Sequence, residues 1–167
     1  GVAHLFEHAE AFARGAAEAA AAPEPRPEAV PFLAACLAES QRLCPVVVHV
    51  TRVAKRTLRL GDWYVPAGTR VAPCAYLAHR APGHYDEPEA YRPERFLGTR
   101  PDPGAYFPFG LGDRLCVGRT LALRQMAVVA AVFLREAPAM RPAPGWTPRA
   151  ERRNLLVAPA GGVPAFL

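Results

Sequence analysis

The sequence is almost without lysine: all but one of its 20 basic residues are arginine, and the exception is Lys55. The net charge is +5, but the basic residues are scattered along the chain. A nucleic-acid-binding surface would instead gather them on one element, often beside stacking aromatic residues. The pattern therefore disfavours a nucleic-acid partner and favours an acidic protein partner.

Long hydrophobic runs are missing as well. No apolar stretch approaches the ~18 to 20 residues that a membrane-spanning helix needs. No signal-peptide pattern opens the chain at Gly1, although a leader lost upstream of this residue stays an open alternative. We therefore predict no membrane segment in this portion of the protein.

Paired cysteines are a third absence. The chain has 4 cysteines but no Cys-x-x-Cys pair, and it lacks the cysteine density of a secreted disulfide scaffold. This spacing disfavours a zinc module of cysteine and histidine ligands. It indicates a reducing compartment, for which we predict the cytoplasm. Cys36, Cys44 and Cys74 are interpreted as small buried side chains.

The chain has 167 residues, of which 51% are hydrophobic, enough for one domain with a core of its own. Helical spacing of apolar residues predicts a helix over 3–22 and another that starts near 28–31 and ends before Pro45. A short helix is predicted over 76–80 and a helix of about 18 residues after Gly118. The apolar face of that last helix is predicted to consist of Leu121, Ala122, Met126, Val129, Val132 and Phe133.

Short strands are predicted between these helices. The β-branched run 46–50 indicates a strand, and 57–60 with 63–65 flank Gly61-Asp62 as in a hairpin. A further strand is predicted from 69 to about 75, and a terminal hairpin from 154–158 and 163–167. The chain therefore predicts a mainly α fold with small β-sheets (α+β). The proline-rich stretch 81–109 lacks periodicity, but its aromatic residues indicate that it packs against the rest.

One loop contains a cysteine that could ligate a metal. It runs from Phe109 to Gly118, with Cys116 directly before the predicted 18-residue helix. Glycines in such a loop let the backbone approach a bulky partner closely. The helix N-terminus provides a positive field that favours the thiolate, which is the form of cysteine that ligates a metal. The alternative for Cys116 is a structural cysteine.

Two further segments precede this loop in order: Glu39-x-x-Arg42 on the second predicted helix, and Pro93-Glu94-Arg95-Phe96. Together with Phe-x-x-Gly-x-Arg-x-Cys-x-Gly in the loop, this succession resembles the cytochrome P-450 family. The resemblance implies that Cys116 is the axial thiolate of a haem iron, with haem b (iron protoporphyrin IX) as the cofactor. It also implies that Glu39, Arg42 and Arg95 form a buried ion triad with a structural role.

The same resemblance implies further cofactor contacts. Arg52 and Arg114 match arginines that bind haem propionates, with ordinary surface charges as the alternative. His79 lies in a segment similar to the family's His-Arg-Asp-Pro sequence, with a structural histidine as the alternative. Phe109, Gly110 and Gly118 would shape the haem pocket around the sulfur.

The resemblance covers roughly residues 28–167, and the first helix fits the one that precedes Glu-x-x-Arg in the family. Residues 1–167 are thus expected to be the C-terminal part of one cytochrome P-450 domain. The N-terminal part, with its oxygen-activating distal helix, is absent, and no catalytic residue is assigned here. Substrate-facing positions would form a small apolar wall: Val46, Val47, Val48, Ala160 and Gly161.

The implied function is a haem-thiolate monooxygenase that inserts one oxygen atom from O2 into an apolar substrate. Electrons would come from a ferredoxin-like, flavodoxin-like or reductase partner. Arg119 and Arg124 are candidates to steer an acidic partner, with a solvated face as the alternative. Two other interpretations stay open: a peroxide-using haem-thiolate enzyme, and a truncated fragment without catalysis.

Overall fold

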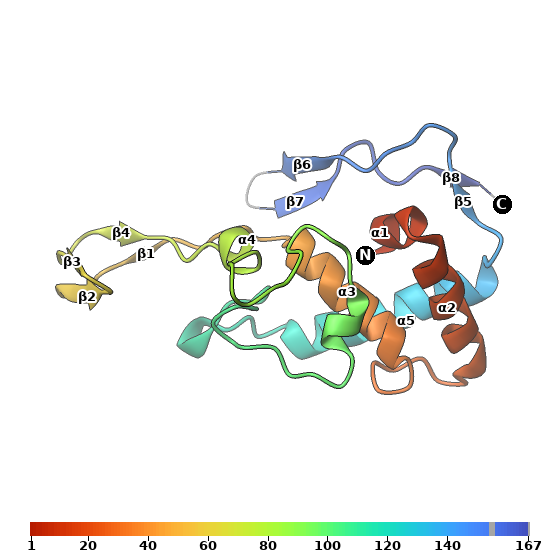
Figure 1. Ribbon diagram of the computed structural model, residues 1–167, viewed down its shortest axis with the longest axis horizontal. Helices are drawn as coiled ribbons and strands as arrows, with labels where there is room; N and C mark the ends of the chain where they lie inside the picture. The colour runs from red at the N-terminus through yellow and green to blue at the C-terminus, as the bar shows by residue number, and fades with distance from the viewer. Residues whose placement is uncertain (154–155, 167) are drawn as a thin grey trace.

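The computed structural model describes residues 1–153 and 156–166. Four helices form its body: α1 (Val2–Glu7), α2 (Ala9–Ala21), α3 (Pro31–Leu43) and α5 (Arg119–Glu136). Figure 1 shows them gathered together, with the strands of residues 52–71 extending to one side as an arm. The predicted α+β fold with small sheets is confirmed. Within the described residues, no helix is long and apolar enough to cross a membrane.

The first helix differs from the prediction, because the stretch 3–22 is split at His8. His8 has a non-helical backbone, and its ring stacks on that of Tyr91 at a centroid distance of 4.5 Å. The break brings the Phe6 ring onto Phe12, with centroids 5.7 Å apart, and it buries Leu5 completely. The contact of His8 with Tyr91 connects distant parts of the chain, so helical periodicity alone does not reveal the break.

Helix α3 begins at Pro31 and ends at Leu43, as predicted. Its N-terminus is capped from another element, since the Glu18 carboxylate of α2 accepts hydrogen bonds from the backbone N–H groups of Phe32 and Leu33, at 2.9 and 2.8 Å. The first N–H groups of a helix have no partner within it, and a carboxylate also suits the positive end of the helix dipole. The position of α3 is therefore set by α2.

Helix α5 has the predicted length, but the predicted apolar face is only partly correct, because Met126 and Phe133 pack against the core while other members of that face are exposed. Leu121 and Val129 are 61% and 64% exposed. The buried side of the helix consists of Ala127, Ala130, Ala131 and Leu134. Small residues allow close approach of two helices: a Cβ added to Gly15 of α2 would lie 3.3 Å from Leu134 Cδ1. Counting large apolar residues missed this face because it is built mainly of alanine.

The described residues form four two-stranded antiparallel sheets. In the arm, β2 (Leu58–Leu60) pairs with β3 (Trp63–Val65) and β1 (Arg52–Val53) with β4 (Arg70–Val71). Near the C-terminus, β6 (Ala150–Arg153) pairs with β7 (Leu156–Pro159) and β5 (Arg141–Pro142) with β8 (Ala165–Phe166). The hairpin around Gly61-Asp62 is confirmed, and the strand expected over 69–75 is shorter.

The predicted strand over 46–50 is wrong. This segment makes one isolated bridge, between His49 and Cys74. Its carbonyl groups instead bond to two different elements: Val46 O accepts from Val157 N–H, and Val48 O from Ala75 N–H, both at 2.8 Å. The predicted terminal hairpin is also wrong, because 156–159 pairs with 150–153 and not with 163–167. Asn154, Leu155 and Leu167 lie outside the described residues.

The stretch 81–109 contains one short 3-10 helix, η1 (Pro93–Phe96). It follows the short helix α4 (Ala75–Ala78) and packs against α3, as its aromatic residues predicted. The Tyr91 hydroxyl donates to Cys36 O at 3.0 Å, and the Tyr106 hydroxyl to Ala38 O at 3.1 Å. All four cysteines are free, and the prediction of buried side chains is confirmed for Cys36, whereas Cys74 is half-buried and Cys44 is exposed.

Replacement of Leu134 by alanine tests the packing of α5 on α2. The side chain is fully buried, so Leu134→Ala should leave a cavity and lower the free energy of unfolding by about 2–5 kcal/mol. Chemical denaturation of the purified chain measures this change. The exposed Val129→Ala is the control and should change stability by only about 0.5 kcal/mol. Equal effects of the two substitutions would contradict the assignment of the buried face.

Candidate functional site

The cysteine loop is held by backbone hydrogen bonds around a short 3-10 helix, η2 (Gly112–Arg114). The Cys116 N–H donates to Phe109 O at 3.0 Å, which closes the loop on itself. Gly110 has a φ of +78°, in the left-handed region that favours glycine. The predicted loop geometry is thus present, and it places Cys116 three residues before the first residue of α5.

The surroundings of the sulfur are open. Cys116 is exposed, and a Cβ added to Gly118 would lie 3.8 Å from its Sγ. Glycine therefore leaves free space on one side of the sulfur, although among the described residues no contact closer than this one stands against a larger side chain. Apolar side chains of the same loop are exposed as well: Leu111, Leu115 and Val117. Cys116 is accessible to a bulky apolar group, which a buried structural cysteine would not be.

Arg42 is the most completely bonded polar group near this loop. Its side chain is fully buried, and it binds both oxygens of Glu39, at 2.7 and 2.8 Å. The guanidinium also donates to the carbonyl groups of His79, Pro88 and Ala90, at 2.9, 2.7 and 3.1 Å. A guanidinium has five N–H donors, and these bonds occupy all of them.

The Glu39 carboxylate, also fully buried, accepts two more hydrogen bonds, from the Arg92 N–H at 2.8 Å and from Arg95 Nε at 3.1 Å. The Arg95 side chain is 15% exposed and donates to the carbonyl group of Asp86 at 3.2 Å. Both cations of the triad lie over one ring, since the Cζ atoms of Arg42 and Arg95 are 4.9 and 5.7 Å from the centroid of Tyr85. Sequence reasoning missed Tyr85 because no spacing rule connects it to the triad.

His79 is fully buried, and both of its ring nitrogens bond to backbone groups. This geometry favours the structural alternative over contact with a cofactor. Burial is the main reason that the pKa of His79 is lowered to about 4, against a usual value of 6.5.

The two arginines predicted to bind propionates are both exposed. Arg114 lies in η2, within the cysteine loop, and forms no ion pair with any described residue. Arg52 lies in β1, on the arm, and donates to the neighbouring Thr51 O at 3.1 Å. In the part of the chain that the structure describes, no hydrogen bond or ion pair joins Arg52 to the cysteine loop.

The predicted apolar wall is only partly assembled. Val48 and Val157 line a small cavity of about 120 Å³ together with His49 and Arg152. Val46 lines a separate cavity of about 420 Å³ between α1, α3 and the β6–β7 hairpin. Ala160 and Gly161 line neither cavity. Sequence reasoning missed Val157, which could have been found only by pairing β7 with the segment that follows α3.

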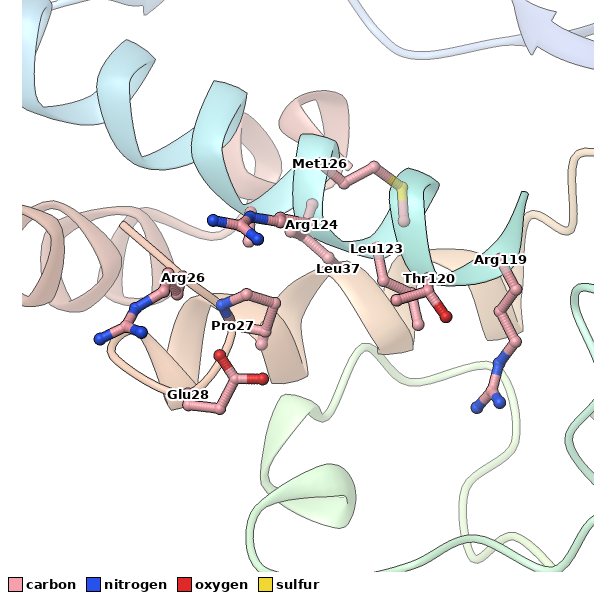
Figure 2. Close-up of a pocket in the computed structure, with 11 residues that line it drawn as sticks. Arg26, Pro27, Glu28, Leu37, Arg119, Thr120, Leu123, Arg124 and Met126 are labelled. Carbon is pink, nitrogen blue, oxygen red and sulfur yellow. The ribbon is translucent and has the colours of Figure 1, made fainter. Parts of the chain in front are cut away.

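A groove of about 470 Å³ runs between α3, α5 and the connector that precedes α3 (Figure 2). Arg119 and Arg124 line it from α5, and Arg26 and Glu28 from the connector. The groove begins next to the cysteine loop, because the Arg119 N–H donates to Cys116 O at 3.2 Å. Three arginines and one carboxylate thus line the groove, and the structure brings both predicted steering arginines to one concave surface.

Comparison with known proteins identifies the family. The family profile described as "Cytochrome P450" matches residues 21–137. The human mitochondrial 25-hydroxyvitamin D-1 alpha hydroxylase is 37% identical over 131 residues, which cover 77% of this chain and 26% of the hydroxylase. The putative cytochrome P450 137 of Mycobacterium tuberculosis is 35% identical over 160 residues, 95% of this chain and 32% of that protein.

A solved structure agrees in fold. A 6-coordinated cytochrome P450 from Thermus thermophilus superposes with a TM-score of 0.77 and 36% identity, covering 96% of this chain and 40% of that chain. The chain belongs to the cytochrome P450 family. It spans between a quarter and two fifths of the length of these relatives.

The family implies a haem group, and the residues around Cys116 fit one. The sulfur is accessible, and Gly118 leaves space beside it. The exposed apolar side chains of the loop suit a flat apolar ring system. Arg114, which has no carboxylate partner among the described residues, suits the propionates of such a group, since guanidinium and carboxylate pair in bidentate fashion.

Replacement of Arg42 by lysine tests the buried triad. Lysine has three donors instead of five and cannot bind the carboxylate in bidentate fashion. Arg42→Lys should therefore lower the free energy of unfolding by about 3–5 kcal/mol, measured by chemical denaturation. Arg92→Lys is the control: its exposed ion pair with Glu87 should contribute no more than about 1 kcal/mol. A stable Arg42→Lys chain would contradict the role of the triad.

Proposed function

We propose that this chain is the haem-binding portion of a haem-thiolate monooxygenase that uses haem b. Members of the cytochrome P450 family are haem-thiolate monooxygenases, and this membership supports the proposal. The observation that carries it is the accessible sulfur of Cys116 at the end of a glycine loop, directly before α5. The four free thiols agree with a reducing compartment, for which we propose the cytoplasm.

A haem group with a thiolate ligand supplies oxygen activation, since the thiolate gives electron density to the iron and favours O–O cleavage. The residues of this chain would hold the group in place. The hydrogen bond from Cys116 N–H to Phe109 O fixes the backbone that carries the sulfur. Arg114 would neutralise a propionate. The Glu39–Arg42–Arg95 triad would hold the irregular segment 81–109 beneath the haem group. Its role would be in haem incorporation and not in turnover.

The proposed reaction is insertion of one oxygen atom from O2 into a small apolar substrate. The name of the human relative is that of a hydroxylase, which agrees with this type of reaction. Val48 and Val157, which line one cavity, are the described side chains that we propose to face the substrate.

Replacement of Cys116 by serine tests the proposed iron ligand. The haem-loaded chain, reduced and exposed to carbon monoxide, should show the red-shifted Soret band of thiolate ligation, and Cys116→Ser should lose it. Cys44→Ser is a matched control, because Cys44 is also an exposed free thiol. A red-shifted band that survives in Cys116→Ser, or that is lost in Cys44→Ser, would contradict the assignment.

We also propose that the groove of Figure 2 receives an acidic electron donor of the ferredoxin, flavodoxin or reductase type. Its three arginines would attract such a partner, and clustered charge raises association rates. The bond from Arg119 N–H to Cys116 O places this surface next to the proposed ligand.

Charge reversal at Arg124 tests the groove. Arg124→Glu should lower the rate constant for reduction of the haem-loaded chain by a ferredoxin, by about 10-fold at low salt, with little effect at high salt. Stopped-flow absorbance measures this rate. Arg135→Glu, at the far end of α5, is the control and should leave the rate nearly unchanged. Equal effects of the two reversals would show that net charge alone, and not the groove, attracts the donor.

A further inference from the structure

His79 connects α3 to the start of the cysteine loop through one fixed tautomer. Its Nε2 accepts the backbone N–H of Phe107 at 3.0 Å, so this nitrogen carries no proton. Its Nδ1 lies 3.2 Å from Arg42 O. A carbonyl oxygen can only accept, so Nδ1 must carry the proton. The two bonds together require a neutral ring with its proton on Nδ1.

The residue that His79 holds, Phe107, lies two residues before the cysteine loop. Phe107 O accepts the Gly110 N–H at 3.0 Å, and Phe109 O accepts the Cys116 N–H at the same distance. A continuous series of hydrogen bonds therefore leads from the last turn of α3, through the imidazole ring, to the residue that carries the sulfur. Release of the Phe107 N–H would remove the fixed start of that series.

We propose that His79 is a positioning residue for Cys116, which ties the cysteine loop to α3 while its ring is neutral and releases the loop when the ring is protonated. The importance of this for haem rests on the proposed function. The tie itself concerns only residues of this chain, and it can be tested without haem.

The surroundings of the ring determine how it responds to pH. Arg42 from α3 and Arg80, two residues after α4, are the charged groups that act on it. The ring centroids of Tyr106 and Phe107 lie 5.2 and 5.5 Å from that of His79. The Glu39 carboxylate is engaged by Nε and Nη2 of Arg42, while Nη1 of that arginine donates to His79 O. Burial and the two arginines disfavour a positive charge on the imidazole, and together they outweigh the backbone hydrogen bonds with Arg42 and Gln41, which favour it.

Burial is the largest cause of the lowered pKa of His79, which is about 4 while the ring is held, against a usual 6.5. Above pH 6.5 the ring is neutral in both the held and the released state, and the tie is intact. Between these two values only the released state binds the proton. Release should therefore become about tenfold more favourable for each pH unit of acidification in this window.

The first experiment uses the unmodified, 15N-labelled chain. Two-bond 1H–15N correlations should show His79 as the neutral tautomer with its proton on Nδ1. The exchange protection of the Phe107 amide, corrected for the intrinsic effect of pH, should fall about tenfold per pH unit from pH 6.5 to about 4. The opposite tautomer, or protection that does not change with pH, would overturn the proposal.

Two substitutions distinguish the hydrogen bond between His79 and Phe107 from a role of the side chain in packing alone. His79→Gln places an amide oxygen near the position of Nε2 and cannot titrate, so Phe107 protection should remain and lose its pH dependence. His79→Asn is too short to reach Phe107, so protection should be low at every pH. His84→Gln is the control, because His84 is exposed and faces Asp102 at 3.7 Å. A pH-dependent loss that persists in His79→Gln would overturn the proposal.

Spectra of the haem-loaded chain then test whether this hydrogen bond of His79 affects ligation by Cys116. The fraction of red-shifted ferrous–CO band should fall severalfold in His79→Asn and remain in His79→Gln. If Cys116→Ser keeps the red-shifted band, the proposed function fails while the amide results still test the tie. If Cys116→Ser loses the band but His79→Asn keeps it in full, the positioning role is overturned.

Discussion

The rest of this structure depends on the hydrogen bonds of the Arg42 guanidinium. It is fully buried, and an isolated buried charge is very unfavourable. It is tolerated here because a bidentate carboxylate and three carbonyl groups satisfy all of its donors. Those carbonyl groups belong to a stretch that has almost no regular secondary structure. One side chain of α3 therefore supplies the order that a helix or sheet would otherwise provide.

The hydrogen bonds of Arg42 also continue to the cysteine loop. His79 contributes its carbonyl oxygen to Arg42 and its ring to Phe107, so the buried charge and the loop share one residue. Loss of either hydrogen bond should therefore weaken the other. The charged triad and the proposed iron ligand are thus parts of one hydrogen-bonded unit, and the separate segments of the sequence motif belong together physically.

Sequence reasoning succeeded where the signal is local or where three segments recur in order. It placed the bounds of α3 and α5 to within a few residues, because Pro45 and Gly118 limit them, and it brought Glu39, Arg42 and Arg95 together. It failed where contacts between residues far apart in the sequence determine the local structure. The buried face of α5 consists of three alanines and Leu134, and it is Leu134 that lies against Gly15. The break at His8 accompanies stacking on Tyr91, and Val46 O accepts one hydrogen bond from Val157 of β7 instead of belonging to a strand.

The way Arg42 is bonded has a consequence for sequence variation. Its hydrogen-bond acceptors outside α3 are the main-chain oxygens of residues 79, 88 and 90, and every amino acid has such an oxygen. Apart from its contact with the ring of Tyr85, the guanidinium thus binds the main chain of this stretch and not its side chains. At positions 88 and 90, this contact leaves evolution free to exchange side chains, provided that the replacement keeps the backbone course.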